Sequence, residues 1–551
     1  MSTLSVSTAI QSRVILTLLF CLMSGWLTTA HAKVSDEVFT EALNSINVKN
    51  FKAKQKAIEK FSTLDDERVL PVLQAISKAE LFYRKKDKLI VYAVKQDGLY
   101  KISNVVNSES LGEVKKKKIR KIRINNRLRR VLRASIANLS LASKDAAVRI
   151  SALNEVLKKI DDDSLSLLKA RLEKEIDEDA RDLINVGLSL YDLQGEDKSK
   201  RLKAIEGLSE SVNPEVRKKL AAILEKDNDH YLEEDKEIRD AAKKALKEID
   251  NNVELFGFIE TTFFGLSLGS VLVLSAIGLA ITFGVMGVIN MAHGELMMIG
   301  AYTTYVIQLM MPNHIDMSLF VAIPSAFIVA GLFGIAIERG VIRHLYGRPL
   351  ETLLATFGIS LVLQQLVRSI FSPLNRSVET PSWMSGSLEI NSILSLTYNR
   401  LYIIIFALLV FAVLLLIMKK TSLGLQVRAV SQNRPMAKAM GIKTEWVDAL
   451  TFGLGSGIAG VAGVALSQLT NVGPNLGQTY IIDSFMVVVF GGVGNLWGTL
   501  VAGLSLGVAN KVLEPWSGAV LAKILVLVFI ILFIQKKPRG LFPQKGRSAE
   551  N

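Results

Sequence analysis

The pattern of apolar and polar positions changes about halfway along the chain. From residue 33 to about residue 250, apolar residues recur at three- and four-residue spacing among charged ones, which predicts short amphipathic helices. From residue 253 onward, long apolar runs replace this pattern. A helix needs about 20 apolar residues to cross the hydrocarbon core of a bilayer. The sequence therefore predicts a water-exposed front domain followed by a membrane domain.

Eight apolar runs in the second half predict membrane helices. The seventh is too long for one crossing and is interrupted by GGVGNLWG, residues 491 to 498. Two short segments hinged at these glycines would give nine crossings, and one long tilted helix is the alternative. An outer front domain and an inner C-terminus require an odd number. The runs lie near residues 258–284, 296–311, 319–338, 352–371, 401–418, 447–469, 481–510 and 519–535.

Basic residues predict which ends of these helices face the cytoplasm. They follow the third, fifth and last runs, and cytoplasmic loops carry an excess of Lys and Arg. Residues 372 to 400, rich in Ser, Asn and Pro, then become an outer loop. The basic residues are Arg339, Arg343 and Arg348; Lys419, Lys420, Arg428, Arg434, Lys438 and Lys443; and Lys536, Lys537 and Arg539.

Four stretches of the front domain are alike. In three of them an Asp or Asn stands at the expected helix N-cap, and an apolar residue and Arg follow. Two intervals are 34 residues and the last is 22, so the stretches resemble HEAT-type helical repeats. A small β-hairpin is also predicted near residues 89–106, turning at Asp97-Gly98. The stretches are DAAVRISALNEVL from Asp145, DARDLINVGLSL from Asp179, NPEVRKKLAAIL from Asn213 and DKEIRDAAKKALKEI from Asp235.

Charge is concentrated in the front domain. Of 66 basic and 52 acidic residues, 19 and 13 lie from residue 253 onward, which leaves 47 and 39 before it. The cluster KKKKIRKIRINNRLRR, residues 115 to 130, would suit nucleic-acid phosphates, but an exported domain meets no nucleic acid. A solvated basic helix or a patch near anionic lipid headgroups is the preferred interpretation.

The N-terminus has the pattern of a secretory signal. Arg13 precedes the apolar run VILTLLFCLMSGWL, and Ala30-His31-Ala32 fits an A-x-A cleavage site. We expect a signal peptide over residues 1–32, with an uncleaved anchor as the alternative; both place residues 33–252 outside the cytoplasm. Cys21, the only cysteine, lies in this segment. No disulfide framework, thiol nucleophile or cysteine metal site is therefore predicted.

The stretch GVINMAHGEL, residues 287 to 296, places Asn290, His293 and Glu295 between apolar runs. On a continuous helix Glu295 would point away from the other two, so convergence requires a break, which Gly287 and Gly294 would permit. Broken helices at membrane depth often line transport sites. A polar cap at the membrane interface is the alternative. His-Gly-Glu lacks a third zinc ligand, so neither a metal nor a cofactor is expected.

GGVGNLWG, with Asn495, is the second predicted break. The two interruptions would face one pathway. The predicted substrate pathway therefore comprises Asn290, His293, Glu295 and Asn495.

Several motifs carry a family resemblance. GVMGVINMAHGELMMIGAY resembles the first-to-second helix segment of permease subunits of branched-chain amino acid and urea ABC importers. The same pattern recurs in TSLGLQVRAVSQNRPMAKAMGI (residues 421–442), GIAGVAGVAL (residues 457–466), VVVFGGVGNLWGTLVAG and PRGLF. The resemblance implies a transmembrane permease domain over residues 253–543 and a cytoplasmic tail over residues 544–551. The long front extension resembles that of the urea-type first permease subunit, which is the reason for expecting urea.

The resemblance also implies a cytoplasmic coupling segment. A short helix with a small-residue face and basic edges could dock into a groove of an ATPase. A positively charged topology anchor is the alternative. The residues that match are Gly424, Arg428, Ala429, Asn433, Ala437 and Gly441.

The chain has no G-x-x-x-x-G-K-[ST] stretch, so ATP hydrolysis is expected from partners and the chain is not expected to be an enzyme. The implied partners are a second homologous permease, two ATP-binding subunits and a periplasmic substrate-binding protein, assembled in a bacterial inner membrane. The predicted fold is all-α: an exported HEAT-like domain over residues 33–252, then a polytopic helical permease. Short amides or branched-chain amino acids are alternative cargoes. A membrane-anchored scaffold is an alternative function, and an intramembrane hydrolase lacks a plausible Ser/His/Asp set.

Overall fold

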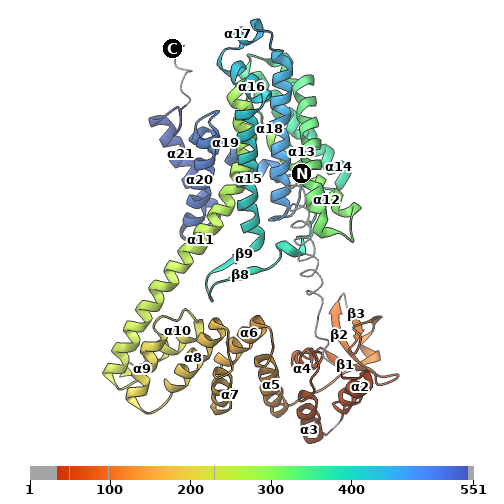
Figure 1. The fold of residues 1–551 in the computed structure, drawn as a ribbon, viewed down its shortest axis with the longest axis vertical. Helices are drawn as coiled ribbons and strands as arrows, with labels where there is room; N and C mark the ends of the chain where they lie inside the picture. Colours follow the sequence, from red (N-terminus) through yellow and green to blue (C-terminus); the bar gives the residue numbers. More distant parts are fainter. Residues whose placement is uncertain (1–33, 49, 97–98, 229, 544–551) are drawn as a thin grey trace, which may run out of the picture. The chain divides into compact units, whose positions relative to one another are not determined.

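The computed structural model describes residues 34–48, 50–96, 99–228 and 230–543 (Figure 1). The chain divides into two compact units, with the boundary between residues 246 and 247 and with residues 212–214 grouped with the second unit. Helix α11 (Lys236–Met286) contributes to both. The predicted signal peptide and C-terminal tail lie outside the described residues.

The front unit begins with three helices and a sheet. The helices are α2 (Asp36–Ser45), α3 (Phe51–Ser62) and α4 (Val69–Lys78). The five antiparallel strands follow the order β4-β3-β2-β1-β5. They are β1 (Leu81–Arg84), β2 (Ile90–Gln96), β3 (Leu99–Asn104), β4 (Ser110–Val114) and β5 (Ile119–Lys121).

This sheet corrects the all-α prediction. The predicted hairpin is confirmed in its strands, because β2 pairs with β3 and Ala93 lies opposite Ile102; its turn at residues 97–98 lies outside the described part. The other three strands were missed. They have three to five residues each, too few for an alternating pattern to stand out.

The basic cluster of residues 115–130 is not one helix. It begins with a 3-10 turn (Lys116–Lys118), continues through β5 and enters α5 (Asn126–Leu141). Ile119 and Ile122 are buried, whereas every Lys and Arg of the cluster is exposed. The interpretation as a basic helix is therefore wrong for its first half, and its exposure agrees with a solvated surface.

Helices and one two-stranded sheet make up the rest of the front unit. Two predicted N-caps are confirmed: Asp145 accepts a hydrogen bond from the Ala147 amide at 2.9 Å, and Asp235 accepts one from the Glu237 amide at 2.8 Å. The fourth stretch differs from the other three, since Asp179 lies inside α8, which Asp177 caps. The helices are α6 (Ala146–Leu157), α7 (Asp162–Leu172), α8 (Glu178–Asp192), α9 (Lys198–Leu208) and α10 (Pro214–Ile223), followed by β6 (Lys226–Asp227), β7 (His230–Tyr231) and α11.

Two of the similar stretches share a side-chain arrangement. Arg149 donates to the carbonyl groups of residues 143 and 144, six and five positions before it. Arg239 donates to the carbonyl groups of residues 233 and 234, at the same offsets. An arginine at the same repeat position thus donates hydrogen bonds to the carbonyl groups of the turn before α6 and of the turn before α11. This similarity supports a repeated unit.

The membrane unit is a helical bundle. Seven of its described helices are long and apolar enough to cross a membrane: α11, α13, α14, α15, α18, α20 and α21. Its elements after α11 are α12 (His293–Met310), α13 (Ile315–Gly340), η2 (Ile342–Leu345), α14 (Pro349–Phe371), η3 (Ser382–Met384), β8 (Ser387–Glu389), β9 (Ser395–Thr397), α15 (Tyr398–Lys420), α16 (Ser422–Gln432), α17 (Arg434–Ala439), α18 (Thr444–Ser467), α19 (Leu476–Gly491), α20 (Leu496–Ser517) and α21 (Ala519–Lys536).

The structure divides the seventh apolar run as predicted. Helix α19 ends at Gly491 and α20 begins at Leu496, so the interpretation as a single long helix is wrong. Helix α19 is short, and α12 falls outside the seven apolar helices although it has 18 residues. Counting both with the seven gives the predicted nine segments, and nine crossings stay a prediction.

Helix α18 packs against α12 and α13. A Cβ atom at Gly463 would lie 1.9 Å from the carbonyl oxygen of Met297, and one at Gly300 would lie 2.0 Å from that of Gly460. Backbones therefore touch along the glycine-rich stretch 457–466. Small residues permit such close contact between membrane helices.

The predicted basic segments lie at one end of the membrane unit. Arg434 contacts Tyr346, which brings the segment after α15 to the loop after α13, and Asn495 bonds to the carbonyl of Phe542 near the C-terminus. The loop after α14 lies at the other end, where the Gln308 side chain pairs with the backbone of Glu379. Figure 1 shows α16 and α17 at one end of the bundle and β8 and β9 at the other. This arrangement is the one that the positive-inside prediction requires.

Candidate functional site

The chain leaves the helical conformation between α11 and α12. Helix α11 ends at Met286 and α12 begins at His293, and Gly287 adopts a left-handed φ of 68°. The first predicted break is thus confirmed. The two breaks are neighbours, because a Cβ atom at Gly284 would lie 2.5 Å from the Cα atom of Gly494.

Glu295 lies in the first turn of α12 and is 1% exposed. Its Oε1 atom accepts hydrogen bonds from the hydroxyl of Ser360 at 2.9 Å and from the amide of Gln364 at 2.7 Å. Its Oε2 atom is buried and has no hydrogen-bond partner among the described residues. One oxygen therefore fixes the carboxylate, and the other is available to a donor.

The partners of Glu295 belong to a polar row on α14. Thr356 accepts a hydrogen bond from the Met291 amide at 3.1 Å, inside the break, and Arg368 donates to Asn475 at 2.7 Å. Residues four apart share one face of a helix. The row comprises Thr352, Thr356, Ser360, Gln364 and Arg368, and sequence reasoning missed it although the four-residue spacing within an apolar run was readable.

His293 and Asn290 have other partners. His293 is fully buried, and its Nε2 atom lies 2.8 Å from the carbonyl oxygen of Ser275 in α11. The Ser275 hydroxyl accepts a hydrogen bond from Ser484 in α19 at 2.7 Å. Asn290 accepts a hydrogen bond from the Ala292 amide at 3.0 Å, within the break. The three polar side chains thus lie close in sequence but bind different neighbours.

Asn290 Nδ2 and His293 Nδ1 are also buried without a described partner. Together with Glu295 Oε2, the break and the first turn of α12 hold three such atoms. Buried polar groups in proteins are usually satisfied, and exceptions call for an explanation such as a ligand or water. Within the described residues no group of three His, Cys, Asp or Glu could hold a metal ion.

Among the residues that the structure describes, the side chain of Asn495 has no hydrogen-bond partner in common with that of Glu295. It caps α20 by accepting a hydrogen bond from the Gly498 amide at 3.2 Å, and it donates to the Phe542 carbonyl at 3.1 Å. The two breaks therefore lie side by side at Gly284 and Gly494. The side chains of Glu295 and Asn495 nevertheless bind different parts of the membrane unit.

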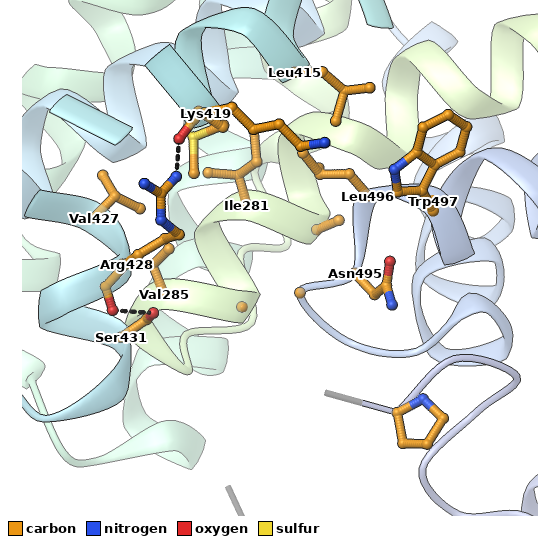
Figure 2. Close-up of a pocket in the computed structure, with 15 residues that line it drawn as sticks. Ile281, Val285, Leu415, Lys419, Val427, Arg428, Ser431, Asn495, Leu496 and Trp497 are labelled. Atoms are coloured by element: carbon orange, nitrogen blue, oxygen red, sulfur yellow. Dashed lines mark hydrogen bonds between the residues drawn. The ribbon is translucent and has the colours of Figure 1, made fainter. Parts of the chain in front are cut away.

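A cavity of about 530 Å³ lies beside the second break, between the ends of α11 and α15, the second half of α16 and the beginning of α20. Figure 2 shows Arg428 and Asn495 on its walls, with Trp497 nearby. Arg428 donates a hydrogen bond to the Met418 carbonyl. A residue predicted for coupling and one predicted for the pathway thus line one cavity, a relation that the sequence did not indicate.

The predicted coupling residues include several that shape the backbone. A Cβ atom at Gly424 would lie 2.2 Å from the Met418 carbonyl oxygen, Asn433 caps α17 by accepting from the Met436 amide at 3.0 Å, and Gly441 has a φ of 86°. Ala437 is buried and Ala429 is partly buried. These small residues let α16 and α17 fold tightly against the bundle.

The outer face of this segment is apolar. Leu425, Met436 and Met440 are 62%, 59% and 76% exposed. Sequence reasoning described a small-residue face and missed these side chains. Exposed apolar residues rimmed by basic ones are typical of protein interaction surfaces.

Known proteins resemble the membrane half. Residues 261–534 match the family model described as branched-chain amino acid transport system / permease component. The high-affinity branched-chain amino acid transport system permease protein LivH of Salmonella typhimurium is 34% identical over 295 residues, which cover 52% of this chain and 95% of LivH.

Two further relatives differ in their coverage. The permease protein BraD of Pseudomonas aeruginosa, of the same described system, is 29% identical over 297 residues, which cover 52% of this chain and 96% of BraD. The ribose import permease protein RbsC of Bacillus subtilis is 29% identical over 140 residues, covering 23% of this chain and 44% of RbsC. No solved structure is significantly similar.

Proposed function

The chain belongs to the branched-chain amino acid permease family of ABC transporters, and from this premise we propose that it is the membrane-spanning permease subunit of an ATP-driven importer of urea. The family consists of transporter subunits, not enzymes, and the chain is a multi-pass membrane protein. The observation that carries the proposal is the buried carboxylate of Glu295, held on one oxygen and free on the other beside a broken helix.

Urea suits this carboxylate. Urea is neutral and planar, with four N–H donors and one carbonyl acceptor, so Glu295 Oε2 could accept from it. Buried unsatisfied acceptors recover free energy when a donor arrives. An amino acid brings its own carboxylate, which a second carboxylate would repel. The front unit is consistent with this cargo, because it lies outside residues 261–534, which the family model matches, and its length resembles the extension of urea-type subunits.

Branched-chain amino acids are the second candidate. Two relatives that match nearly their whole length are described as permeases for these solutes. In this case Arg368, at the end of the α14 row, would have to accommodate the carboxylate. Short amides are a further alternative cargo, and they share the N–H donors and the carbonyl acceptor of urea.

Energy would enter through α16 and α17. The apolar face of Leu425, Met436 and Met440 is rimmed by Arg428 and Lys438, and it would dock into a groove of an ATP-binding subunit. The proposed assembly contains this subunit, a second homologous permease, two ATP-binding subunits and a periplasmic substrate-binding protein. The basic end of the bundle would face the cytoplasm, and the HEAT-like front unit would face the periplasm of a bacterial inner membrane.

Uptake of labelled urea and labelled leucine tests the proposal. Cells that lack the gene are complemented with the wild-type chain or with Glu295→Ala, and membrane insertion is measured in both. We expect the wild-type chain to restore urea uptake and Glu295→Ala to fail. Restoration of leucine uptake alone would replace urea by the second candidate. Restoration of neither, with normal insertion, would favour a membrane-anchored scaffold.

A further inference from the structure

Arg434, the first residue of α17, contacts two other parts of the membrane unit. Its guanidinium donates two hydrogen bonds to the carboxylate of Asp448 in α18, one of them from Nη1 to Oδ1 at 3.2 Å. Nη1 also donates to the Tyr346 hydroxyl at 2.7 Å, and the guanidinium carbon lies 3.9 Å from the centre of the Tyr346 ring. One side chain therefore joins α17, α18 and the connection between η2 and α14.

The chemistry of this contact requires arginine. The Asp448 side chain is 4% exposed and the Arg434 side chain is 27% exposed. A planar guanidinium can donate two parallel hydrogen bonds to a carboxylate and stack on an aromatic ring, whereas a lysine ammonium cannot do both. The contact thus fixes the orientation of α17 as well as its position.

The partners of Arg434 lie in, or directly before, helices that bound the Glu295 site. Asp448 lies in α18, whose glycine-rich part touches α12 at Met297, two residues after Glu295. Tyr346 lies three residues before Pro349, where α14 begins with the polar row that holds Glu295. A movement of α17 could reach the site through either helix.

We propose that Arg434 is a positioning residue for energy coupling, which transmits displacement of the α16–α17 segment to α18 and α14. The inference rests on the proposed function, because it takes α16 and α17 as the docking site of the ATPase. Coupling between distant sites travels through packed elements and hydrogen-bonded contacts. Without a rigid link, the short connections at residues 433 and 440–443 would absorb the movement.

The test compares transport with ATP hydrolysis in the complete assembly, reconstituted in liposomes. Arg434→Lys keeps the charge and loses the paired hydrogen bonds. We expect it to insert and hydrolyse ATP normally, while solute imported per ATP falls roughly tenfold, within the usual range of coupling effects. A wild-type ratio for this variant would overturn the proposal.

A double variant separates positioning from stability. Removing one partner of a buried ion pair destabilises a protein, whereas replacing both by apolar residues is often neutral. Arg434→Met with Asp448→Leu should therefore fold and assemble, yet its import per ATP should remain low. Recovery of the wild-type ratio would show that the pair only stabilises the fold and would overturn the proposal.

Two further variants complete the design. Arg343→Gln removes a half-exposed ion pair, 3.0 Å long, between η2 and Glu445 of α18. Among the described residues Arg343 forms no ion pair with α17, and we expect a near-wild-type ratio. An equal loss in Arg343→Gln would overturn the specific role of Arg434.

Met440→Glu should prevent assembly with the ATPase. If assembly persists, the docking proposal is wrong. If assembly is lost but Arg434→Lys keeps the wild-type ratio of solute to ATP, only the proposed role of Arg434 is wrong.

Discussion

The amide nitrogen of Gln364 lies 2.7 Å from the carboxylate of Glu295, although the two residues are 69 positions apart in sequence. Gln364 lies on a continuous helix, whereas Glu295 follows a break. The hydrogen bond thus attaches the irregular segment to a rigid element. Because Ser360 donates to the same oxygen, the second oxygen keeps its acceptor capacity.

Glu295→Ala should abolish most of the transport. It removes the acceptor proposed for the solute and leaves two donors of α14 without their partner, at about 1–3 kcal/mol for each buried group left unsatisfied. We expect solute uptake to fall roughly tenfold or more, since 1.4 kcal/mol corresponds to a factor of ten. Labelled-solute uptake, normalised to the amount of inserted protein, measures this. Glu389→Gln, in the exposed strand β8, is the matched control, and full uptake by Glu295→Ala would remove the residue from the pathway.

Gln364→Leu should have a smaller effect, and one that depends on Glu295. It removes one of two donors to the carboxylate, so we expect uptake to fall by roughly threefold to tenfold, as for a hydrogen bond to a charged group of about 1.5–3 kcal/mol that is partly replaced by Ser360. In the Glu295→Ala background the same change should have little further effect, because contacting residues are not additive. Additive losses would show that Gln364 acts elsewhere.

The sequence predicted the interruptions because their cause is local. Glycines and polar residues stand inside apolar runs at both breaks. The N-caps of the front unit are local in the same way, since Asp145 caps α6 and Asp235 caps α11. The partners of Glu295 could not be predicted in the same way, since the contact joins residues of two helices. A four-residue spacing from Thr352 to Arg368 nevertheless marked one polar face of α14.

Other features could not be predicted from the sequence, for equally physical reasons. Asn495 stands in the second break, yet its side chain caps α20 and binds the Phe542 carbonyl, which no local pattern reveals. Sequence reasoning described the coupling segment by its small and basic residues. It missed the apolar face, because the sequence does not show whether Met436 and Met440 are buried or exposed. Strand β5 has three residues, and its basic surroundings resembled a charged helix.

Gly463→Ala should destabilise the membrane unit strongly. A Cβ atom there would lie 1.9 Å from the Met297 carbonyl oxygen, so α12 and α18 would have to separate. Overpacking of this kind costs about 1–3 kcal/mol, occasionally more. Gly358→Ala, in α14, is the control because a Cβ atom meets nothing within 4 Å there. Thermal denaturation in detergent should show a lower midpoint for Gly463→Ala alone; equal midpoints would contradict the tight packing.

Met436→Glu should weaken assembly with the ATP-binding subunits. The side chain is 59% exposed, so the change should leave the fold intact while placing a charge in the proposed apolar contact. Charged groups are costly when desolvated without a partner. Co-purification of the ATP-binding subunits measures the effect. Arg343→Gln, at a half-exposed position in η2 outside the proposed docking surface, should retain assembly, and retention by Met436→Glu as well would place the contact elsewhere.

Glu175→Gln should destabilise the front unit in a pH-dependent way. The buried carboxylate of Glu175 accepts hydrogen bonds from Arg149 at 2.7 Å and from Arg171 at 2.9 Å. Burial alone would raise the pKa of Glu175, but the hydrogen bonds from the two arginines lower it to about 2. A carboxylate whose pKa is depressed by folding stabilises the folded state above its unfolded pKa of 4.5, and this contribution is lost as pH falls from there toward 2.

Removing the charge should cost about 3–5 kcal/mol at neutral pH, the usual effect of breaking a buried ion pair. Hydrogen exchange of the α6 and α8 amides in the full chain, corrected for intrinsic rates, measures the loss. Glu155→Gln, in α6, is the control, since its pair with Lys158 is more than half exposed and such pairs contribute about 0–1 kcal/mol. The wild-type advantage over Glu175→Gln should shrink below pH 4.5, because protonation then removes the same charge. An advantage that stayed constant from neutral pH to pH 3 would mean that Glu175 stabilises α6 and α8 by packing and not as a carboxylate.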